Sequence, residues 1–356
     1  MKNNIFSKLL DAKHRGRTGS FALVIISYII IEALMHTGSL SSLFSSLLVP
    51  VTCYIVASIG LNMNVGISGE LNLGQAGFMS VGAFTAVSVS GRLAPIMPNP
   101  IIRLIFAIVA GIIMAAVFGI IIGIPVLKLE GDYLAIVTLA FGQIIKSIIT
   151  NMYLGFDDTG LHFSFVEKTM SLNPGGKMLL DGPMGATGVQ RIANFTAGVI
   201  LILISLIVVY NIIYSRSGRA IMAARDNRIA AESVGIDISK TKMLSFVLSA
   251  SLAGAAGALY GLNYSTLVPA KFDFNTSILI LVYVVLGGLG NMTGTIISTV
   301  ILVLLPELLR SMQDYRMLIY AVVLIAIMIL TNNDRVKTFF AGLRQSIFRK
   351  KQEGSV

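Results

Sequence analysis

Few side chains in this chain are of the types that catalyse reactions or bind metals, and those few are scattered. The three histidines, His14, His36 and His162, lie far apart, and none belongs to the H-E-x-x-H pattern of zinc enzymes. The Gly-Lys pair that begins at Gly176 is followed by methionine, so it is not the phosphate-binding loop of an ATPase. The single cysteine, Cys53, lies in an apolar run and excludes an internal disulfide. The sequence therefore predicts no catalytic residues, no metal site and no bound cofactor.

Carboxylates within membrane segments would indicate ion-coupled transport, because proton and sodium pumps bury such groups in their spans. Glu32 and Glu70 are the candidates for such a relay, and both lie near the flanks or breaks of apolar runs. The long runs 101–127, 195–214, 243–270 and 274–306 contain a single charged residue, Arg103, which lies near an edge. The sequence predicts a pathway that is passive in itself and is driven by another subunit.

Charge is concentrated in residues 215–242, which we call the island. It lies between two uncharged runs, 195–214 and 243–261. Its basic residues outnumber its acidic ones, and the charged positions are Arg216, Arg219, Arg225, Asp226, Arg228, Glu232, Asp237, Lys240 and Lys242. Short loops rich in Lys and Arg stay on the cytoplasmic side of a membrane. The island is therefore predicted to be a cytoplasmic loop.

The island has the pattern of a structured element. Residues 219–234 are predicted to form one helix whose apolar face holds Ile221, Ala224 and Ile229. Its charged side chains are predicted to face solvent: Arg225, Asp226 and Glu232. Gly235 fits the left-handed position that ends a helix, and Ser239 fits the N-cap of the next helix. A loop that only fixed topology would need no such terminator, so we predict that the island docks a partner.

The elements that position these residues are membrane spans. Of 356 residues, 55% are hydrophobic and 12% are charged, and the mean hydropathy is +0.83. Soluble domains carry about a quarter charged residues. The net charge of +10 comes from juxtamembrane clusters, which indicates topology rather than nucleic-acid binding. About ten runs of roughly 20 residues are predicted to cross: 21–36, 43–61, 71–90, 101–124, 132–150, 194–214, 243–263, 277–289, 292–309 and 316–331.

The charge pattern sets the predicted orientation and domain organisation. With the basic N-terminus inside, an even number of spans brings both the island and the basic C-terminus to the cytoplasmic side. The predicted domains are a cytoplasmic N-terminal segment (1–20), an all-α transmembrane domain (21–331) and a cytoplasmic basic tail (332–356). Residues 151–193 form an external loop, expected to be irregular with one short surface helix, where an external partner lands.

Residues 60–84 mix glycines with polar side chains at membrane depth. Polar groups and irregular backbone are tolerated there only where they face a cavity or protein. A Gly/Asn-rich counterpart occurs at 287–294, and paired interruptions are typical of transporters built from repeats. The residues predicted to line a pathway are Asn62, Asn72, Gly74, Gln75, Gly77, Thr138, Gly287 and Gly288. The alternative for 60–84 is a cytoplasmic re-entry loop, and Thr138 also suits a hydrogen bond within the helix bundle.

Four blocks in order resemble one known family. They are GLNMNVGISGELNLGQAGFMSVGAFTA (60–86), LEGDYLAIVTLAFGQII (129–145), the island with the run after it (215–261), and ILVYVVLGGLGNMTGTIIS (280–298). Together they resemble the permease subunits of branched-chain amino acid ABC transporters, specifically the LivM-type subunit, over roughly residues 45–330. The resemblance implies the ABC importer permease fold and a multi-pass protein of the bacterial cytoplasmic (inner) membrane.

The resemblance also implies partners. A second homologous permease would complete the pathway, two ATP-binding cassette ATPase subunits would use ATP, and an extracytoplasmic solute-binding protein would deliver leucine, isoleucine or valine. In that family the third block docks on the ATPase, which implies docking residues here: Arg225, Asp226, Ala231, Glu232 and Gly235.

Two alternatives stay open at this point. Relatives that carry urea, short amides or other amino acids share most of these blocks, and the external loop here departs from the usual Thr-Gly-Gly-rich stretch. A stand-alone secondary transporter would instead need carboxylates within its spans and would not need a docking island.

Overall fold

The computed structural model describes residues 15–38, 41–129, 131–157, 160–165, 176–310, 315 and 318–325. The chain divides into two compact units, the first ending at Val300 and the second beginning at Ile301. The candidate site lies in the first unit. In the second, residues 318–325 are helical, and Arg310 pairs with Glu307 at 2.8 Å.

The prediction of an all-α membrane bundle is confirmed, because long apolar helices dominate the described residues. The long helices are α2 (Arg15–His36), α3 (Ser42–Asn62), α4 (Gln75–Leu93), α5 (Pro100–Val126), α6 (Asp132–Thr150), α7 (Phe195–Ile213), α10 (Ile238–Gly261), α11 (Phe274–Gly287) and α12 (Met292–Leu308). Seven segments of the described chain are long and apolar enough to cross a membrane: Arg17–His36, Phe44–Ser68, Pro100–Val126, Asp132–Thr150, Phe195–Ile213, Ile238–Gly261 and Pro269–Gly287.

Three predicted spans differ from these segments. The predicted span 71–90 begins too early, because its first residues are not helical and α4 starts at Gln75. The span predicted at 292–309 corresponds to α12, which is shorter than the seven. The last predicted span, 316–331, lies partly outside the described residues.

Helix α10 is the centre of the bundle, where it packs against α3, α4 and α5. Most of its second half is buried alanine, glycine and leucine. A Cβ atom added at Gly82 of α4 would overlap with Gly254 of α10, and one added at Gly257 would overlap with the carbonyl group of Met79. Small residues let helix backbones approach this closely within a membrane. The tight α4–α10 contact fixes the position of α4, which carries much of the candidate site.

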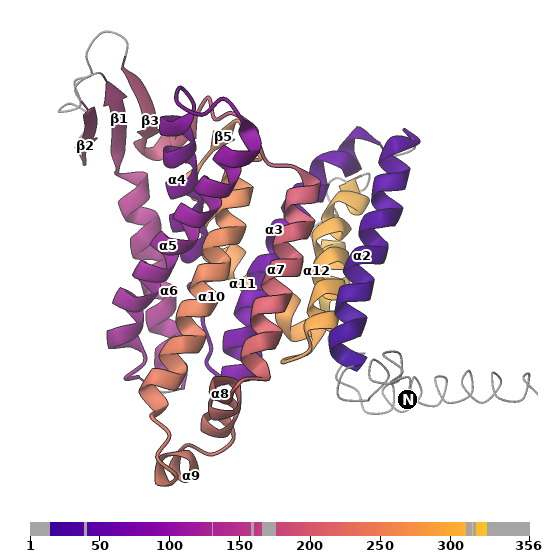
Figure 1. Ribbon diagram of the computed structural model, residues 1–356, viewed down its shortest axis with the longest axis vertical. Helices are drawn as coiled ribbons and strands as arrows, with labels where there is room; N and C mark the ends of the chain where they lie inside the picture. The colour runs from indigo at the N-terminus through magenta and orange to yellow at the C-terminus, as the bar shows by residue number, and fades with distance from the viewer. Residues whose placement is uncertain are drawn as a thin grey trace, which may run out of the picture. The chain divides into compact units, whose positions relative to one another are not determined.

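The loop of residues 151–193 is more regular than predicted. Its described part contains a three-stranded antiparallel sheet in the order β2-β1-β3, built from β1 (Tyr153–Asp157), β2 (Gly160–Ser164) and β3 (Lys177–Asp181). A 3-10 turn, η3 (Gly182–Met184), follows, and β4 (Ala186–Thr187) pairs with β5 (Thr266–Leu267). The expected surface helix is therefore wrong for the described residues, apart from this one turn. This sheet and the island lie at opposite ends of the first unit (Figure 1).

Candidate functional site

Residues 69–74, which we call the break, separate two helical segments. Helix α3 continues into a π-helical turn, η1 (Met63–Ser68), and the chain then turns at Gly69, whose φ of +76° is left-handed. Glycine adopts this conformation at little cost. Helical structure resumes at Gln75, the first residue of α4. The irregular stretch predicted within 60–84 is therefore confined to the break, and the residues before it are helical.

Side chains from three elements satisfy the backbone N–H groups where α4 begins. The hydroxyl of Thr138 in α6 accepts from the N–H of Leu73 at 3.1 Å. The side-chain oxygen of Asn72 accepts from Gly74 at 2.8 Å, and the Ser277 hydroxyl in α11 accepts from Ala76 at 3.0 Å. The first N–H groups of a helix have no partner within the helix. These bonds allow α4 to start inside the bundle rather than at its surface.

Gln75 connects the start of α4 to two more helices. Its side-chain nitrogen donates to the carbonyl oxygen of Ala57 in α3 at 3.0 Å. Its side-chain oxygen lies 3.3 Å from the donors of both Asn72 and Ser249, the latter in α10. Gln75 and Asn72 are fully buried. Polar groups this deep are stable because they are hydrogen-bonded to one another.

Helices α4 and α6 touch at glycines, in a contact that we call the crossing. A Cβ atom added at Gly74 would lie 2.5 Å from the carbonyl oxygen of Thr138. One added at Gly77 would lie 2.8 Å from the Cα atom of Gly142. Real Cβ atoms essentially never lie so close to backbone atoms. The structure thus brings five of the predicted pathway residues together at one contact: Asn72, Gly74, Gln75, Gly77 and Thr138.

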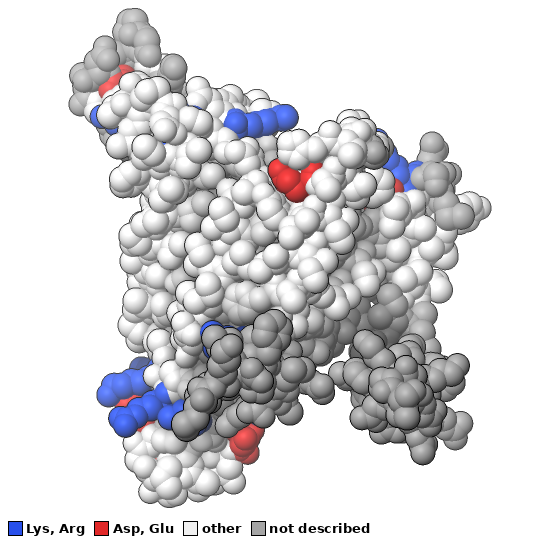
Figure 2. Space-filling model, turned by 45° about the vertical axis from the view of Figure 1, so that its right-hand side comes forward, with Lys and Arg blue, Asp and Glu red and all other residues white. Residues whose placement is uncertain are grey.

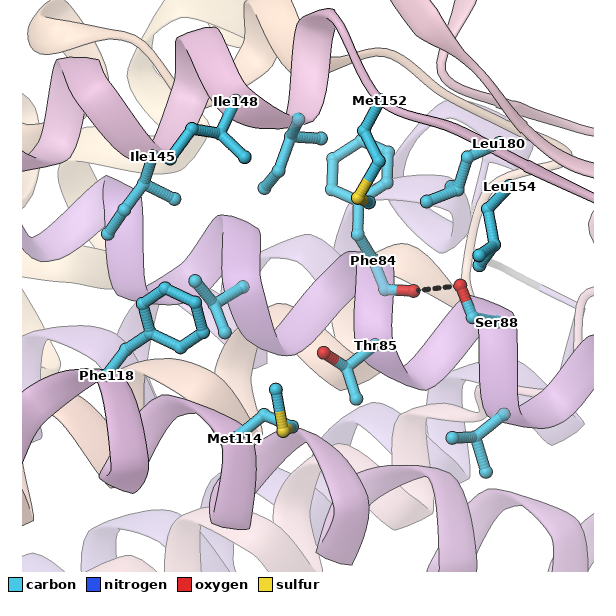
Figure 3. A pocket seen from close by; sticks show the side chains of 13 residues that line it. Phe84, Thr85, Ser88, Met114, Phe118, Ile145, Ile148, Met152, Leu154 and Leu180 are labelled. Carbon is cyan, nitrogen blue, oxygen red and sulfur yellow. Dashed lines mark hydrogen bonds between the residues drawn. The ribbon is translucent and has the colours of Figure 1, made fainter. Parts of the chain in front are cut away.

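Beyond the crossing, an apolar cavity of about 280 Å³ lies between α4, α5 and α6 (Figure 3). Strands β1 and β3 also contribute to its wall. All of its lining side chains except Thr85 and Ser88 are apolar: Val81, Phe84, Val89, Met114, Phe118, Ile145, Ile148, Ile149, Met152, Leu154 and Leu180. Ser88 donates to the carbonyl oxygen of Phe84 in its own helix at 2.8 Å. The cavity therefore offers mainly hydrophobic contact.

The other predicted pathway residues lie at a different place, where the two Gly/Asn-rich segments meet. The side-chain oxygen of Asn62 accepts from the N–H of Gly290 at 2.8 Å, and its nitrogen donates to the Thr295 hydroxyl at 2.8 Å. A Cβ atom added at Gly287 would overlap with Thr295, and Gly288 has a φ of +90°. Asn62, Gly287 and Gly288 therefore belong to a helix junction between η1 and the α11–α12 turn.

The two carboxylates considered as an ion relay both have basic neighbours. Glu32 lies 3.9 Å from His36 near the end of α2. Glu70, in the break, forms an ion pair with Lys242 at the start of α10, and both side chains are largely buried. The Glu70 carboxylate therefore joins the break to the start of α10.

The island contains two helices rather than the single one predicted for 219–234. Helix α8 (Arg216–Asp226) and helix α9 (Arg228–Ser233) meet at Asn227, which has extended backbone angles. The side-chain oxygen of Asn227 accepts from the N–H of Ala230 at 3.0 Å and so caps α9. Asparagine is among the preferred N-cap residues, which explains the interruption.

Two details of the predicted island are also wrong. Ile229 does not share the buried face of Ile221 and Ala224, because it follows the interruption and is 80% exposed. The N-cap of α10 is Asp237 rather than Ser239, and its carboxylate accepts from the N–H of Lys240 at 3.0 Å. This backbone hydrogen bond and the neighbouring Lys240 side chain hold the pKa of Asp237 below its ordinary value. The hydrogen bond favours the charged form of the cap.

The predicted docking residues take different positions within the island. Ala231 is buried with Ala224 and Ile238 in a small core. Glu232 is half exposed and pairs with Arg228 at 3.1 Å, while Asp226 is exposed and pairs with Arg225 at 2.9 Å.

Figure 2 shows charged side chains near both ends of the visible face, separated by a broad band of uncharged residues. The charge pattern of this face is that of a membrane-spanning bundle.

Gly235 ends the island's second helix, as predicted, with a φ of +82°. Nothing lies within 4 Å of a Cβ atom added there, so a substitution costs only backbone strain. We expect Gly235→Ala to cost about 1–2 kcal/mol locally. Amide hydrogen exchange at residues 235 and 236, whose N–H groups donate to Glu232 and Ala231, should then accelerate about 5- to 30-fold. Gly235→Asn is the matched variant, and its amides should exchange more slowly than those of Gly235→Ala, because Asn tolerates this conformation. Equal exchange rates in the two variants would show that backbone strain is not the cause.

Sequence reasoning missed several residues that complete the site. Gly142 lies four residues after Thr138, on the same face of α6, and this spacing could have identified it. Ser249 and Ser277 hold the start of α4 but carry no signal of their own, because serine is common in membrane helices. Lys242 was assigned to the island's charge pattern, whereas it is paired inside the protein with Glu70.

Residues 43–330 match a known family, described as "Branched-chain amino acid transport system / permease component". The chain is 33% identical over 290 residues to the high-affinity branched-chain amino acid transport system permease protein LivM of Salmonella typhimurium, and 32% identical over 290 residues to that of Escherichia coli. Each match covers 78% of this chain and 66% of the relative, so it spans slightly less than two thirds of those proteins. The fructose import permease protein FruG of Bifidobacterium longum is 22% identical over 305 residues, or 84% of each chain. No solved structure matches the chain.

Proposed function

Because this chain belongs to the family of permease components of branched-chain amino acid transport systems, we propose that it is a permease subunit of an ATP-driven ABC importer that translocates leucine, isoleucine and valine. The observation that carries the proposal is the family match across residues 43–330, which includes the break, the crossing and the island. The proposed location is the bacterial cytoplasmic membrane, with the island and both termini on the cytoplasmic side.

The apolar cavity favours branched aliphatic side chains as cargo. Its wall is hydrophobic almost throughout, and its two hydroxyl-bearing side chains are on α4. Burial of an aliphatic side chain in such a wall is favourable, whereas burial of a charged or strongly polar one is costly. The relatives named for branched-chain amino acids are also more similar to this chain than the fructose permease is. We place the cargo's route along the cavity, beside the crossing at which α4 and α6 are in backbone contact.

The proposed partners supply ATP hydrolysis, the rest of the pathway and the delivery of cargo. Two ATPase subunits bind and hydrolyse ATP and dock on the island, a second permease completes the pathway, and a solute-binding protein delivers cargo at the end that carries the β-sheet. In the island, Ala231 and Gly235 fix the shape of α9, while Asp226 and Glu232 present charge at its surface. Ile229 in α9 and Val234 directly after it are 80% and 74% exposed. We call these two residues the tip of the island, and in this proposal they supply apolar contact to the ATPase.

The test of this function is purification from the native membrane in mild detergent, followed by reconstitution. We expect two ATPase subunits and a second permease to co-purify, and we expect uptake of radiolabelled L-leucine, L-isoleucine and L-valine to require ATP and the binding protein. Recovery of this chain alone, with uptake driven by an ion gradient, would identify a secondary transporter instead.

The apolar tip of the island gives a more specific prediction. Ile229→Asp combined with Val234→Asp should remove the ATPase subunits from the purified complex, because both changes place a charge in a contact that is apolar in this proposal. Both residues are exposed, so the fold of the permease should be unaffected. Ile96→Asp is the matched control, since Ile96 is 64% exposed in the turn that follows α4. Retention of the ATPase by the double variant would exclude this tip from the interface.

A further inference from the structure

Arg225, the penultimate residue of α8, reaches out of the island into the membrane bundle. Its guanidinium nitrogen Nη1 donates to the carbonyl oxygen of Gly66 in η1 at 3.0 Å. Its aliphatic stem covers Gly69, where an added Cβ atom would lie 2.7 Å from Cγ of Arg225. The last carbonyl groups of a helix have no partner within the helix. Arg225 therefore caps a carbonyl group near the end of η1 and also covers Gly69, the left-handed residue that follows η1.

A second contact joins the other end of the island to the same segment. Lys242, in the first turns of α10, forms an ion pair with Glu70, the second residue of the break. The exposed fractions of the two side chains are 14% and 11%. One turn further along α10, Ser245 donates its hydroxyl hydrogen to the carbonyl oxygen of Met63 at 3.2 Å. Separating a largely buried ion pair is costly, because each partner would be left as an uncompensated charge in the interior.

These contacts enclose residues 66–70 between the two ends of the island. In the chain, α9 and the exposed tip lie between Arg225 and Lys242. The segment they hold leads within a few residues to Asn72, Gly74 and Gly77 at the crossing. A force on the tip that moves α8 and the start of α10 must therefore move the break as well.

We propose that Arg225 and the Glu70–Lys242 pair form a clasp that transmits movement of the island to the break, and through the break to the crossing. In this role Arg225 is a positioning residue that acts inside the permease, rather than a contact with the ATPase. The proposal rests on the proposed function, because it needs an ATPase that moves the island. It also explains why the polar, irregular break lies beside the basic island. Arg225 of the island bonds to a backbone carbonyl group just before the break, and Lys242 pairs with the Glu70 carboxylate of the break.

The test separates ATP hydrolysis from transport in the complete transporter, reconstituted in lipid vesicles with its ATPases, second permease and binding protein. The two rates to be measured are ATP hydrolysis and uptake of radiolabelled L-leucine. Arg225→Met keeps a long apolar stem over Gly69 but removes the donor to Gly66 and, with it, the exposed ion pair to Asp226. We expect this variant to retain its ATPase subunits and to transport about tenfold less leucine per ATP hydrolysed, within the range of ordinary coupling free energies. Lys128→Met, at an exposed position before α6, is the matched control and should keep the wild-type ratio.

The ion pair provides a second, independent measurement. Glu70→Lys alone should lose coupling, and Glu70→Lys combined with Lys242→Glu should restore it, because the exchanged pair keeps opposite charges at the same positions. Three results would overturn the clasp: a wild-type ratio in Arg225→Met, loss of the ATPase subunits from that variant, or no recovery in the exchanged pair. A wild-type complex without ATP-dependent uptake would instead overturn the proposed function, and the clasp with it.

Discussion

Replacing Gly77 with leucine should reduce uptake by the assembled transporter to background, and Gly77→Ala should already impair it severely. The added Cβ atom would lie 2.8 Å from the Cα atom of Gly142, which is backbone and cannot rotate away. Helix α4 cannot move away from α6, since α10 packs closely against α4 through glycines of both helices. Overpacking of a tight core costs about 1–3 kcal/mol for small additions and more for large ones. If the route passes beside the crossing, the same side chain also obstructs it.

Stability and transport must be measured separately to interpret this result. The amount of membrane-inserted protein and its thermal unfolding in detergent report on folding, and L-leucine uptake per inserted molecule reports on function. Gly19→Ala is the matched control, because Gly19 is also within a helix and nothing lies within 4 Å of its added Cβ atom. Normal uptake by stable Gly77→Leu protein would move the pathway away from the crossing.

Most of the architecture follows from local sequence signals. Apolar runs located the helices, because a span needs about 20 apolar residues. The error at α4 has a physical cause: the residues from Leu71 to Gly74 are apolar enough to continue a span, but their N–H groups bond to Asn72 and Thr138 side chains. Hydropathy measures how well a segment tolerates lipid, and it is blind to polar partners supplied by other helices.

The sheet was missed for a different reason. Two short segments on either side of a turn signal have an alternating pattern that includes aromatic residues, although they contain no β-branched residue. They are Y-L-G-F-D (153–157) and G-L-H-F-S (160–164). The prediction instead gave weight to the glycines and prolines of the whole loop, which favour irregular structure. In the structure the strands pair in register from Tyr153 with Ser164 to Asp157 with Gly160. Arg92, from the end of α4, lies over the ring of Phe156 at 3.4 Å from its centroid and fixes the sheet to the bundle.

The candidate site was predictable as a set of residues but not as a set of contacts. The glycines and amides of 60–84 stand out because their types are costly in lipid. Their partners, Ser249, Ser277 and Lys242, come from helices far along the chain, and one sequence carries no record of which helices meet. Arg225 illustrates the limit most clearly: its charge indicated a cytoplasmic surface, whereas its guanidinium group bonds to the backbone of η1.

Replacing Gln75 with methionine should destabilise the start of α4 and greatly reduce uptake. Methionine is similar in length and apolar, so the change removes hydrogen bonds without adding bulk. The amide of Asn72 and the hydroxyl of Ser249 then lose an acceptor in a fully buried place. Each stranded polar group costs about 1–3 kcal/mol. The measurements are thermal unfolding of the purified complex and L-leucine uptake, with Ser251→Ala as the control, since Ser251 bonds only to Val247 of its own helix among the contacts described.

Gln75→Glu distinguishes lost hydrogen bonding from lost shape. Glutamate has the same length as glutamine and keeps an oxygen that accepts from Asn72 and Ser249. A buried carboxyl group is favoured in its neutral form, in which it can also donate to the carbonyl oxygen of Ala57. We therefore expect stability and uptake to fall in the order wild type, Gln75→Glu, Gln75→Met. The reverse order of the two variants would show that the interior at Gln75 requires only apolar packing. The hydrogen bonds from Gln75 to α3, the break and α10 would then contribute nothing to holding α4 in place.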